Sequence, residues 1–178
     1  MALAPDRMEH TAGLITTQVC ALFLHGPSPT RQGDSKPTPM IAVSHVEAVA
    51  GKGLRGDRRY LHATRRDGKE NLRQVSLIDE ATLRRHEAQF GPVPWELVKS
   101  QIVLAGAVPL CDLLGRSLVF GDGDAGAILQ LTIERRPCFA MDLIASGLRA
   151  AMEHGAQGAL ARVVRGGLIA VGQTITFQ

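Results

Sequence analysis

The chain has 178 residues, of which 45% are hydrophobic and 21% are charged, which is the balance of a globular domain and excludes a disordered or fibrous protein. No apolar run approaches the roughly 18 to 20 residues that a membrane helix needs, and the first ten residues lack the features of a secretory signal. We therefore expect a cytoplasmic protein that does not interact with a membrane. The formal net charge of +3 is too small to predict nucleic-acid binding, which requires a basic face that covers many phosphates.

The length predicts one domain with a substantial core, because two domains of this total size would each be small. Residues 1–12 are expected to form a flexible N-terminus, and residues 13–178 a single domain. The sequence contains no internal repeat and no low-complexity segment.

The first predicted element is a strand within residues 13–24, where apolar and β-branched residues are concentrated. Residues 25–39 contain four prolines and two glycines and predict a loop, either a lid or a docking segment. Residues 40–49 predict a second strand.

A strand followed by a helix is predicted next. Apolar and polar residues alternate over 71–78, as in a half-buried strand. Asp79 then occupies an N-cap position, and residues 80–90 predict a short helix that Gly91 ends.

The rest of the chain predicts short elements separated by turns. We expect a strand at 102–104, a turn or short helix at 110–114, strands at 117–120 and 128–133, a helix at 137–151, and a hairpin at 160–176. Many short strands with few helices and no strand–helix–strand alternation indicate a mainly β protein, a closed or partly closed β-barrel with short inserted helices.

The segment from Gly51 to Gly56 matches the G-x-G-x-x-G pattern of dinucleotide-binding proteins. Such a site also needs an apolar helix immediately after the glycines, and residues 57–68 have no apolar stripe of helical period. A dinucleotide site is therefore not expected.

The same glycines allow backbone N–H groups to turn toward an anion, while Arg55, Arg58 and Arg59 supply positive charge. Asp57 would orient these arginines or cap the turn. The alternative is a charged, solvated loop without a ligand. Gly56 and these side chains are nevertheless candidates for an anion site.

Arginine dominates the basic residues. Sixteen of the 20 are arginines, and six of these lie between Arg55 and Arg73. A guanidinium is planar and can bind phosphate at two points, which an ammonium cannot do. Arg73 and Ser76 could both meet a phosphate, although a GC-rich genome that favours arginine codons would give the same bias.

The segment from Glu134 to Cys138 carries the strongest chemical signal. Arg135 and Arg136 precede Cys138, and Pro137 suits the first turn of a helix. Positive charge and a helix N-terminus both favour a thiolate over a thiol, so Cys138 is expected to be nucleophilic. The alternative is that this cysteine is a small buried hydrophobic residue.

The other cysteines, Cys20 and Cys111, lie in apolar segments and are assigned to the core. No Cys-x-x-Cys pair occurs, and none of the six histidines pairs at the spacing of metal ligands. Neither a disulfide framework nor a structural zinc site is expected.

Five segments together resemble the MOSC family, which is named after the C-terminal domain of molybdenum cofactor sulfurases. In chain order they are Gly53-Leu-Arg-Gly-Asp-Arg58, Arg73-Gln-Val-Ser-Leu-Ile-Asp79, Leu113-Leu-Gly-Arg-Ser-Leu118, Thr132-Ile-Glu-Arg-Arg-Pro-Cys138 and Ala161-Arg-Val-Val-Arg-Gly-Gly-Leu-Ile-Ala-Val-Gly172. The resemblance covers the chain from about residue 13 to its end.

The resemblance implies a β-barrel similar to that of pyruvate kinase and a site for the molybdenum cofactor, molybdopterin. In cofactor sulfurases the cysteine at the position of Cys138 is proposed to carry a persulfide, and in amidoxime-reducing relatives it ligates molybdenum. Both roles need a thiolate.

The resemblance also implies residues that contact the phosphate and pterin edges of the cofactor. They are Arg55, Gly56, Asp57, Arg58, Arg73, Ser76, Arg135, Arg136, Arg162 and Arg165. Many relatives have a histidine where this chain has Arg59.

Three functions stay open at this point. Cys138 could transfer sulfur as a persulfide, it could bind molybdenum in an enzyme that reduces N-hydroxylated substrates, or the protein could carry the cofactor without turnover. The chain has no room for the pyridoxal-phosphate domain of the sulfurases, so pyridoxal phosphate is not expected. The partners implied are a sulfur donor or an electron-transfer protein, and a molybdoenzyme acceptor.

Overall fold

A computed structural model describes residues 15–27, 38–61, 64–65, 67–121 and 126–178. The N-terminal segment 1–12 and most of the predicted loop 25–39 lie outside these ranges.

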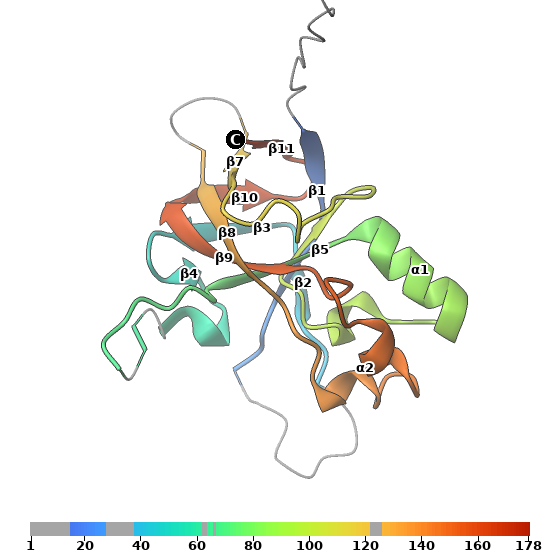
Figure 1. Cartoon of the computed structure of the whole chain (residues 1–178). Helices are drawn as coiled ribbons and strands as arrows, with labels where there is room; N and C mark the ends of the chain where they lie inside the picture. The colour runs from blue at the N-terminus through green and yellow to red at the C-terminus, as the bar shows by residue number, and fades with distance from the viewer. Residues whose placement is uncertain (1–14, 28–37, 62–63, 66, 122–125) are drawn as a thin grey trace, which may run out of the picture.

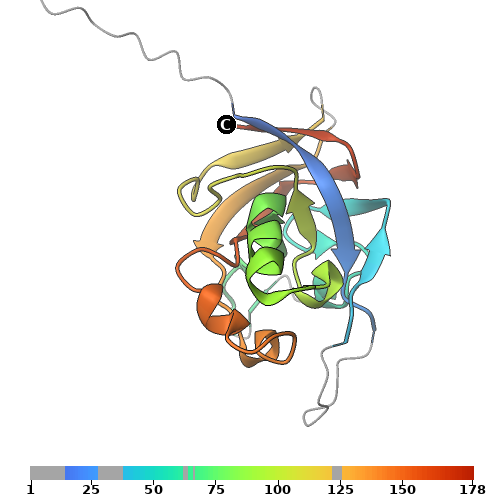
Figure 2. The same cartoon turned by 90° about the vertical axis from the view of Figure 1, so that its right-hand side faces the viewer.

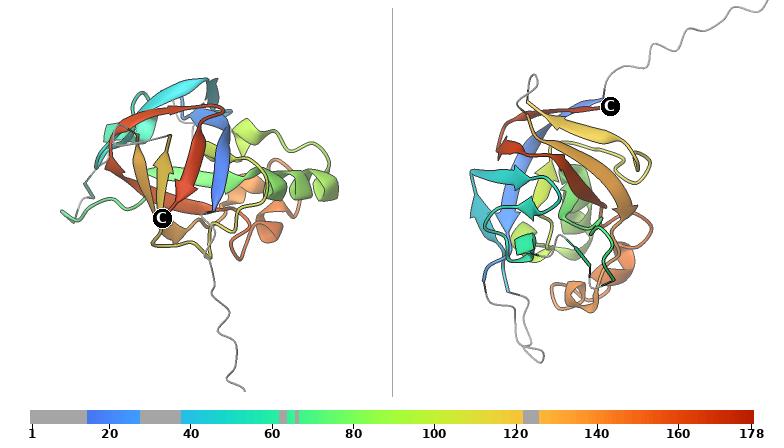
Figure 3. Two further views of the ribbon diagram at one scale, coloured as in Figure 1. Left: turned by 90° about the horizontal axis from the view of Figure 1, so that it is seen from above. Right: turned by 90° about the vertical axis from the view of Figure 1, so that its left-hand side faces the viewer.

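Seven strands in the described residues close into a barrel (Figure 1). Around the barrel they are β11 (Thr174–Phe177), β7 (Ser117–Phe120), β8 (Ile128–Glu134), β9 (Ala159–Arg165), β5 (Val75–Asp79), β6 (Ile102–Leu104) and β1 (Thr16–Leu24). The barrel closes because β1 pairs antiparallel with β11, Thr17 opposite Ile175. Figure 3 shows these two strands side by side, one blue and one red. The mainly β barrel predicted from the sequence is thus confirmed.

A second sheet of three strands lies beside the barrel. Its order is β10 (Gly167–Ala170), β3 (His45–Val49) and β4 (Gly53–Leu54). The short strand β2 (Ile41–Val43) belongs instead to the barrel sheet, where it pairs with β1. The predicted strand at 40–49 is therefore two strands in two sheets, separated at Ser44.

Two apolar clusters form the core. The larger fills the barrel and includes Leu77, Leu104 and Phe120, each fully buried. The smaller lies outside the barrel wall and includes Ile78 and Leu83. Because one face of β5 points into the barrel and the other packs against the second cluster, all five of its residues are buried.

Helix α1 (Glu80–Phe90) covers the outside of the barrel (Figure 2). Asp79 caps it by accepting a hydrogen bond from the Thr82 N–H at 2.9 Å, and Gly91 ends it with a φ of +80°. Both ends are as predicted.

The sequence predicted no strand–helix–strand unit, and this prediction is wrong. Strands β5 and β6 are parallel neighbours, with Leu77 opposite Ile102. Parallel strands need a long crossover, and α1 followed by the 3₁₀ helix η2 (Trp95–Leu97) supplies it.

The prediction of a helix at 137–151 is also wrong. The segment contains the 3₁₀ helix η3 (Phe139–Met141) and the four-residue helix α2 (Leu148–Ala151). Gly147 has a φ of +83°, which an α-helix does not accommodate, and the buried side chains of Met141 and Leu148 fix the segment against α1.

The predicted C-terminal hairpin does not form, because consecutive strands pair with different neighbours. β9 pairs with β5 and β8, β10 pairs with β3, and β11 pairs with β7 and β1. A Cβ added at Gly166, between β9 and β10, would lie 2.9 Å from the Ala48 carbonyl oxygen. The chain passes from the barrel sheet to the second sheet at Gly166, where there is no room for a side chain.

None of the helices in the described ranges is both long enough and apolar enough to cross a membrane.

We predict that Gly158→Ala destabilises the fold by about 3 kcal/mol or more. Gly158 has a φ of +80°, and an added Cβ would lie 2.0 Å from the Leu77 carbonyl oxygen in β5. Gly172→Ala is the matched control, because Gly172 has a φ of +83° but a Cβ added there would meet no described residue within 4 Å. The control should lose only roughly 1–2 kcal/mol, the cost of the left-handed backbone. Urea unfolding measures both, and equal losses would contradict the close approach.

Candidate anion-binding site around Cys138

A cavity of about 450 Å³ opens beside Cys138. The residues that line it are Arg59, Asn71, Arg73, Lys99, Arg135, Arg136, Cys138, Gln157 and Leu160. Five of these nine described residues are cationic and none is an aspartate or glutamate. The cavity wall thus has a concentrated positive charge that the lining residues do not neutralise.

Arg135 is the most deeply buried of these cations. Its guanidinium donates to Ser100 Oγ at 2.6 Å and to the Val98 carbonyl at 2.9 Å. Burial lowers the pKa of Arg135 to about 9, and the charge of Arg59 lowers it as well. Arg135 is therefore still cationic at neutral pH, although no carboxylate forms an ion pair with it in the described ranges. Buried charges in proteins are normally paired, so this arrangement favours an anionic ligand.

Two further cations line the cavity: Arg59, predicted as a charge of the glycine-rich loop but not as a cofactor contact, and Lys99, which was not predicted. Arg59 lies in the 3₁₀ helix η1 (Arg58–Leu61), and Lys99 follows η2 with a φ of +66°. Burial, together with nearby arginines, lowers the pKa of both side chains. The Lys99 ammonium donates to the Thr38 carbonyl.

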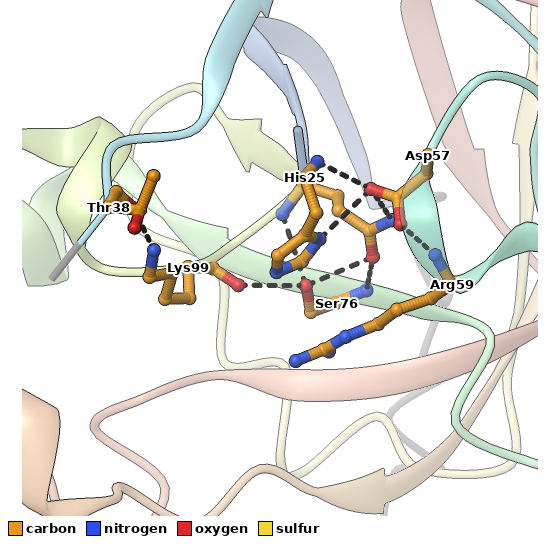
Figure 4. A network of polar contacts seen from close by, with 7 residues as sticks. His25, Thr38, Asp57, Arg59, Ser76 and Lys99 are labelled. Atoms are coloured by element: carbon orange, nitrogen blue, oxygen red, sulfur yellow. Dashed lines mark hydrogen bonds and ion pairs between the residues drawn. The ribbon is translucent and has the colours of Figure 1, made fainter. Parts of the chain in front are cut away.

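A buried hydrogen-bond network holds the backbone of both cations (Figure 4). Its centre is Asp57, only 4% exposed, whose carboxylate accepts from the His25 N–H at 2.8 Å, the Arg59 N–H at 2.8 Å and Gln101 Nε2 at 2.9 Å. On the other side of Gln101, Ser76 Oγ accepts the Gln101 N–H and donates to the Lys99 carbonyl at 3.2 Å. The end of β1, η1, β5 and the start of β6 are thereby joined.

Asp57 is ionised and His25 is neutral in this network. Burial alone would raise the pKa of Asp57, but the hydrogen bonds from His25 and Arg59 lower it further than burial raises it. Burial lowers the pKa of His25. The His25 Nδ1–H therefore donates to the Asp57 carboxylate, at 2.9 Å.

Cys138 is exposed and lies directly before η3. A three-residue 3₁₀ helix has almost no macrodipole, so the predicted support of a thiolate by a helix N-terminus is wrong. Positive charge beside Cys138 comes instead from side chains that line the same cavity, among them Arg59, Lys99 and Arg135. Cys20 and Cys111 are half-buried, and burial raises the pKa of each thiol.

Three of the predicted binding residues, Arg73, Arg135 and Arg136, line the cavity with Cys138. Asp57 and Ser76 lie behind its wall as part of the buried network.

The other predicted residues do not line the cavity. Arg55 is exposed and bound to the Glu47 carboxylate at 2.5 and 3.1 Å. Arg162 donates to Glu70 and Gln130, and Arg165 donates to the Gly126 carbonyl. Gly56 adopts a φ of +84°, and the Arg58 N–H donates to the His25 carbonyl, so both shape the turn.

Sequence reasoning missed Asn71, Lys99, Gln157 and Leu160. The polar run Lys99-Ser100-Gln101 directly before an apolar strand was the available signal for Lys99. Gln157 and Leu160 carry no local signal. Within the described parts of the chain, no group of three or more histidine, cysteine, aspartate or glutamate residues is placed to hold a metal ion.

No protein-family model and no curated protein matches this sequence significantly. Solved structures do match. The YuaD protein from Bacillus subtilis superimposes with a TM-score of 0.71 at 20% sequence identity, over 92% of this chain and 96% of that one. YiiM from Geobacillus stearothermophilus gives a TM-score of 0.62 at 17% identity, over 91% and 75% of the two chains. YiiM from Escherichia coli gives 0.61 at 14% identity, over 90% and 69%.

These likenesses support a MOSC-like fold. At such low identities they concern the arrangement of the chain and not its ligand.

We predict that Asp57→Asn lowers the free energy of unfolding by about 2–4 kcal/mol. The amide presents one acceptor oxygen where the carboxylate accepts from His25, Arg59 and Gln101. Asp67→Asn is the control, because Asp67 is exposed and its change should stay within about 0.5 kcal/mol. Chemical denaturation of both variants at pH 7 measures the difference. If Asp57→Asn is as stable as the wild type, the hydrogen-bond network does not stabilise the fold.

Proposed function

We propose that this protein binds the molybdenum cofactor, an anionic phosphate-bearing pterin, in the cavity around Cys138, and that Cys138 transfers sulfur. One observation carries the proposal: an exposed thiol shares a cavity with five cations and, among the described lining residues, no carboxylate. The MOSC-like fold and the resemblance of the motif that ends at Cys138 support it.

The residues present fit such a ligand. A volume of about 450 Å³ lies within the range of small-molecule sites. Arg59, Arg73 and Arg135 would hold the phosphate, because guanidinium groups bind phosphate oxygens in pairs. Arg135 contributes most, since its charge is buried and no carboxylate of the described residues forms an ion pair with it. When bound, the cofactor would supply a metal centre that accepts sulfur.

The role of Cys138 in sulfur transfer follows ordinary thiol exchange. The Cys138 thiolate attacks the outer sulfur of a persulfide on a donor protein, a new S–S bond forms at Cys138, and the donor cysteine leaves as a thiolate. No net oxidation occurs. The exposure of Cys138 allows a donor to reach it, and the adjacent Phe139, 70% exposed, offers an apolar contact. A molybdoenzyme would be the final acceptor.

A second candidate function uses the same thiolate as a molybdenum ligand. It is favoured by the position of Cys138 in the wall of the cationic cavity. In that case the protein would reduce an N-hydroxylated substrate and take electrons from a partner protein.

We predict that sulfur loading depends on Cys138 and not on Cys20. The protein is purified without reductant from a host that makes the cofactor, as wild type, Cys138→Ser and Cys20→Ser. Sulfur transfer predicts an intact mass higher by one sulfur atom in wild type and Cys20→Ser, lost in Cys138→Ser. Cys20 is the control because burial raises its pKa.

Elemental analysis of the same samples separates the two candidates. Stoichiometric molybdenum that disappears only in Cys138→Ser supports the metal ligand and the reductase. If all three proteins carry neither extra sulfur nor molybdenum, the proposal fails.

We also predict that Arg135→Met abolishes stabilisation by pyrophosphate. An anion present at about 100 times its Kd adds about 2.7 kcal/mol to the stability of a protein that binds it. The melting temperature of the wild type should rise accordingly, and that of Arg135→Met should not. Arg55→Met is the matched control, because Arg55 pairs with Glu47 away from the cavity. If Arg135→Met keeps the response as Arg55→Met does, the anion binds elsewhere.

A further inference from the structure

Gln157 is a polar residue in the cavity wall that no motif predicted. Its side chain is 1% exposed, and Oε1 is buried without a hydrogen-bond partner among the described residues. Buried polar atoms without a partner are rare, because each loses its hydration and gains nothing in return. Because Gln157 also lines the cavity, this acceptor is a candidate partner for a ligand there.

The backbone keeps Gln157 at this place. Gly155 and Gly158, on either side, have φ values of +85° and +80°, and the Gly158 N–H donates to the Gly155 carbonyl at 2.9 Å. Gly158 packs so closely on β5 that an added Cβ would lie 2.0 Å from the Leu77 carbonyl. The Gly158 carbonyl accepts the Arg135 N–H at 2.9 Å. This loop therefore holds Gln157 close to the backbone of Arg135, and both residues line the cavity.

Gln157 Oε1 is a hydrogen-bond acceptor in a cavity wall whose charged side chains are all donors. Five cations in the same wall are hydrogen-bond donors, yet none of them donates to Gln157 Oε1. An inorganic anion would use the cations and leave this acceptor unpaired. A ligand that satisfies the whole wall has an anionic group and a hydrogen-bond donor of its own.

We propose that Gln157 Oε1 accepts a hydrogen bond from a ring N–H of the bound ligand. The ligand class is then a planar heterocycle with an N–H edge joined to a phosphate, and Leu160 supplies an apolar wall for the ring. This inference rests on the proposed function, in which the same cavity binds a phosphate-bearing pterin. Gln157 determines specificity, and the arginines determine affinity for the charge.

The test compares two nucleotides by calorimetric titration. Guanosine 5′-monophosphate presents an N–H and an NH₂ on its ring edge, which is also the edge chemistry of a pterin. Purine riboside 5′-monophosphate has the same phosphate and ring size without these donors. Wild type should bind the guanine nucleotide about fivefold to tenfold more tightly, the ratio that one net hydrogen bond supplies.

Gln157→Met should bring this ratio to about one and leave the affinity for purine riboside 5′-monophosphate within about twofold. Gln157→Asn, which keeps an amide but is one methylene shorter, should lose the preference as well. Gln89→Met, on the exposed face of α1, is the control and should keep it. Thermal unfolding of each variant verifies that it is folded.

Failure of this inference and failure of the proposed function give different results. If wild type binds both nucleotides equally, or if Gln157→Met keeps the preference, the role of Gln157 is overturned while the cationic site stands. If wild type binds neither nucleotide, the phosphate site fails, and the role of Gln157 fails with it.

Discussion

Asp57 lies buried between the end of β1 and the start of η1, where its carboxylate accepts hydrogen bonds from His25, Arg59 and Gln101. These partners belong to three segments that are far apart in the sequence. Through Gln101 and Ser76 the network continues to the carbonyl of Lys99. The positions of two cavity cations, Arg59 and Lys99, therefore depend on one buried carboxylate. Because folding fixes these cations in advance, the proposed anionic ligand would meet a site that needs little rearrangement.

Several residues of the cavity wall destabilise the folded protein, as is typical of binding sites. A buried guanidinium at Arg135, a left-handed backbone at Lys99 and an amide oxygen at Gln157 without a partner among the described residues each disfavour the folded state. The closed barrel and its two apolar clusters offset these costs. All three features lie in the wall of one cavity, which is the pattern expected where selection acts on a ligand and not on the fold alone.

Elements with a local cause could be predicted from the sequence. Helix α1 has its cap at Asp79 and its stop at Gly91, and both signals lie within a few residues of the ends they set. The segment at 137–151 was mispredicted because the left-handed conformation of Gly147 and the burial of Met141 against α1 are not visible in a periodic pattern. The same holds for the C-terminal strands, since each of them chooses a partner from another part of the chain.

The sequence by itself determined the mainly β character of the protein, helix α1, and the association of Arg135 and Arg136 with Cys138, because neighbours in the chain stay neighbours in space. Only the tertiary structure decided which distant residues join them. Barrel closure brings the loops before β5, β6 and β9 to the end of β8, so that Arg73, Lys99 and Gln157 share one cavity with Cys138. Two other predicted cations form ion pairs elsewhere: Arg55 pairs with Glu47 in the second sheet, and Arg162 pairs with Glu70. Motif spacing cannot report that Arg73, Lys99 and Gln157 share a cavity with Cys138, because these residues lie beside strands that pair only in the folded barrel.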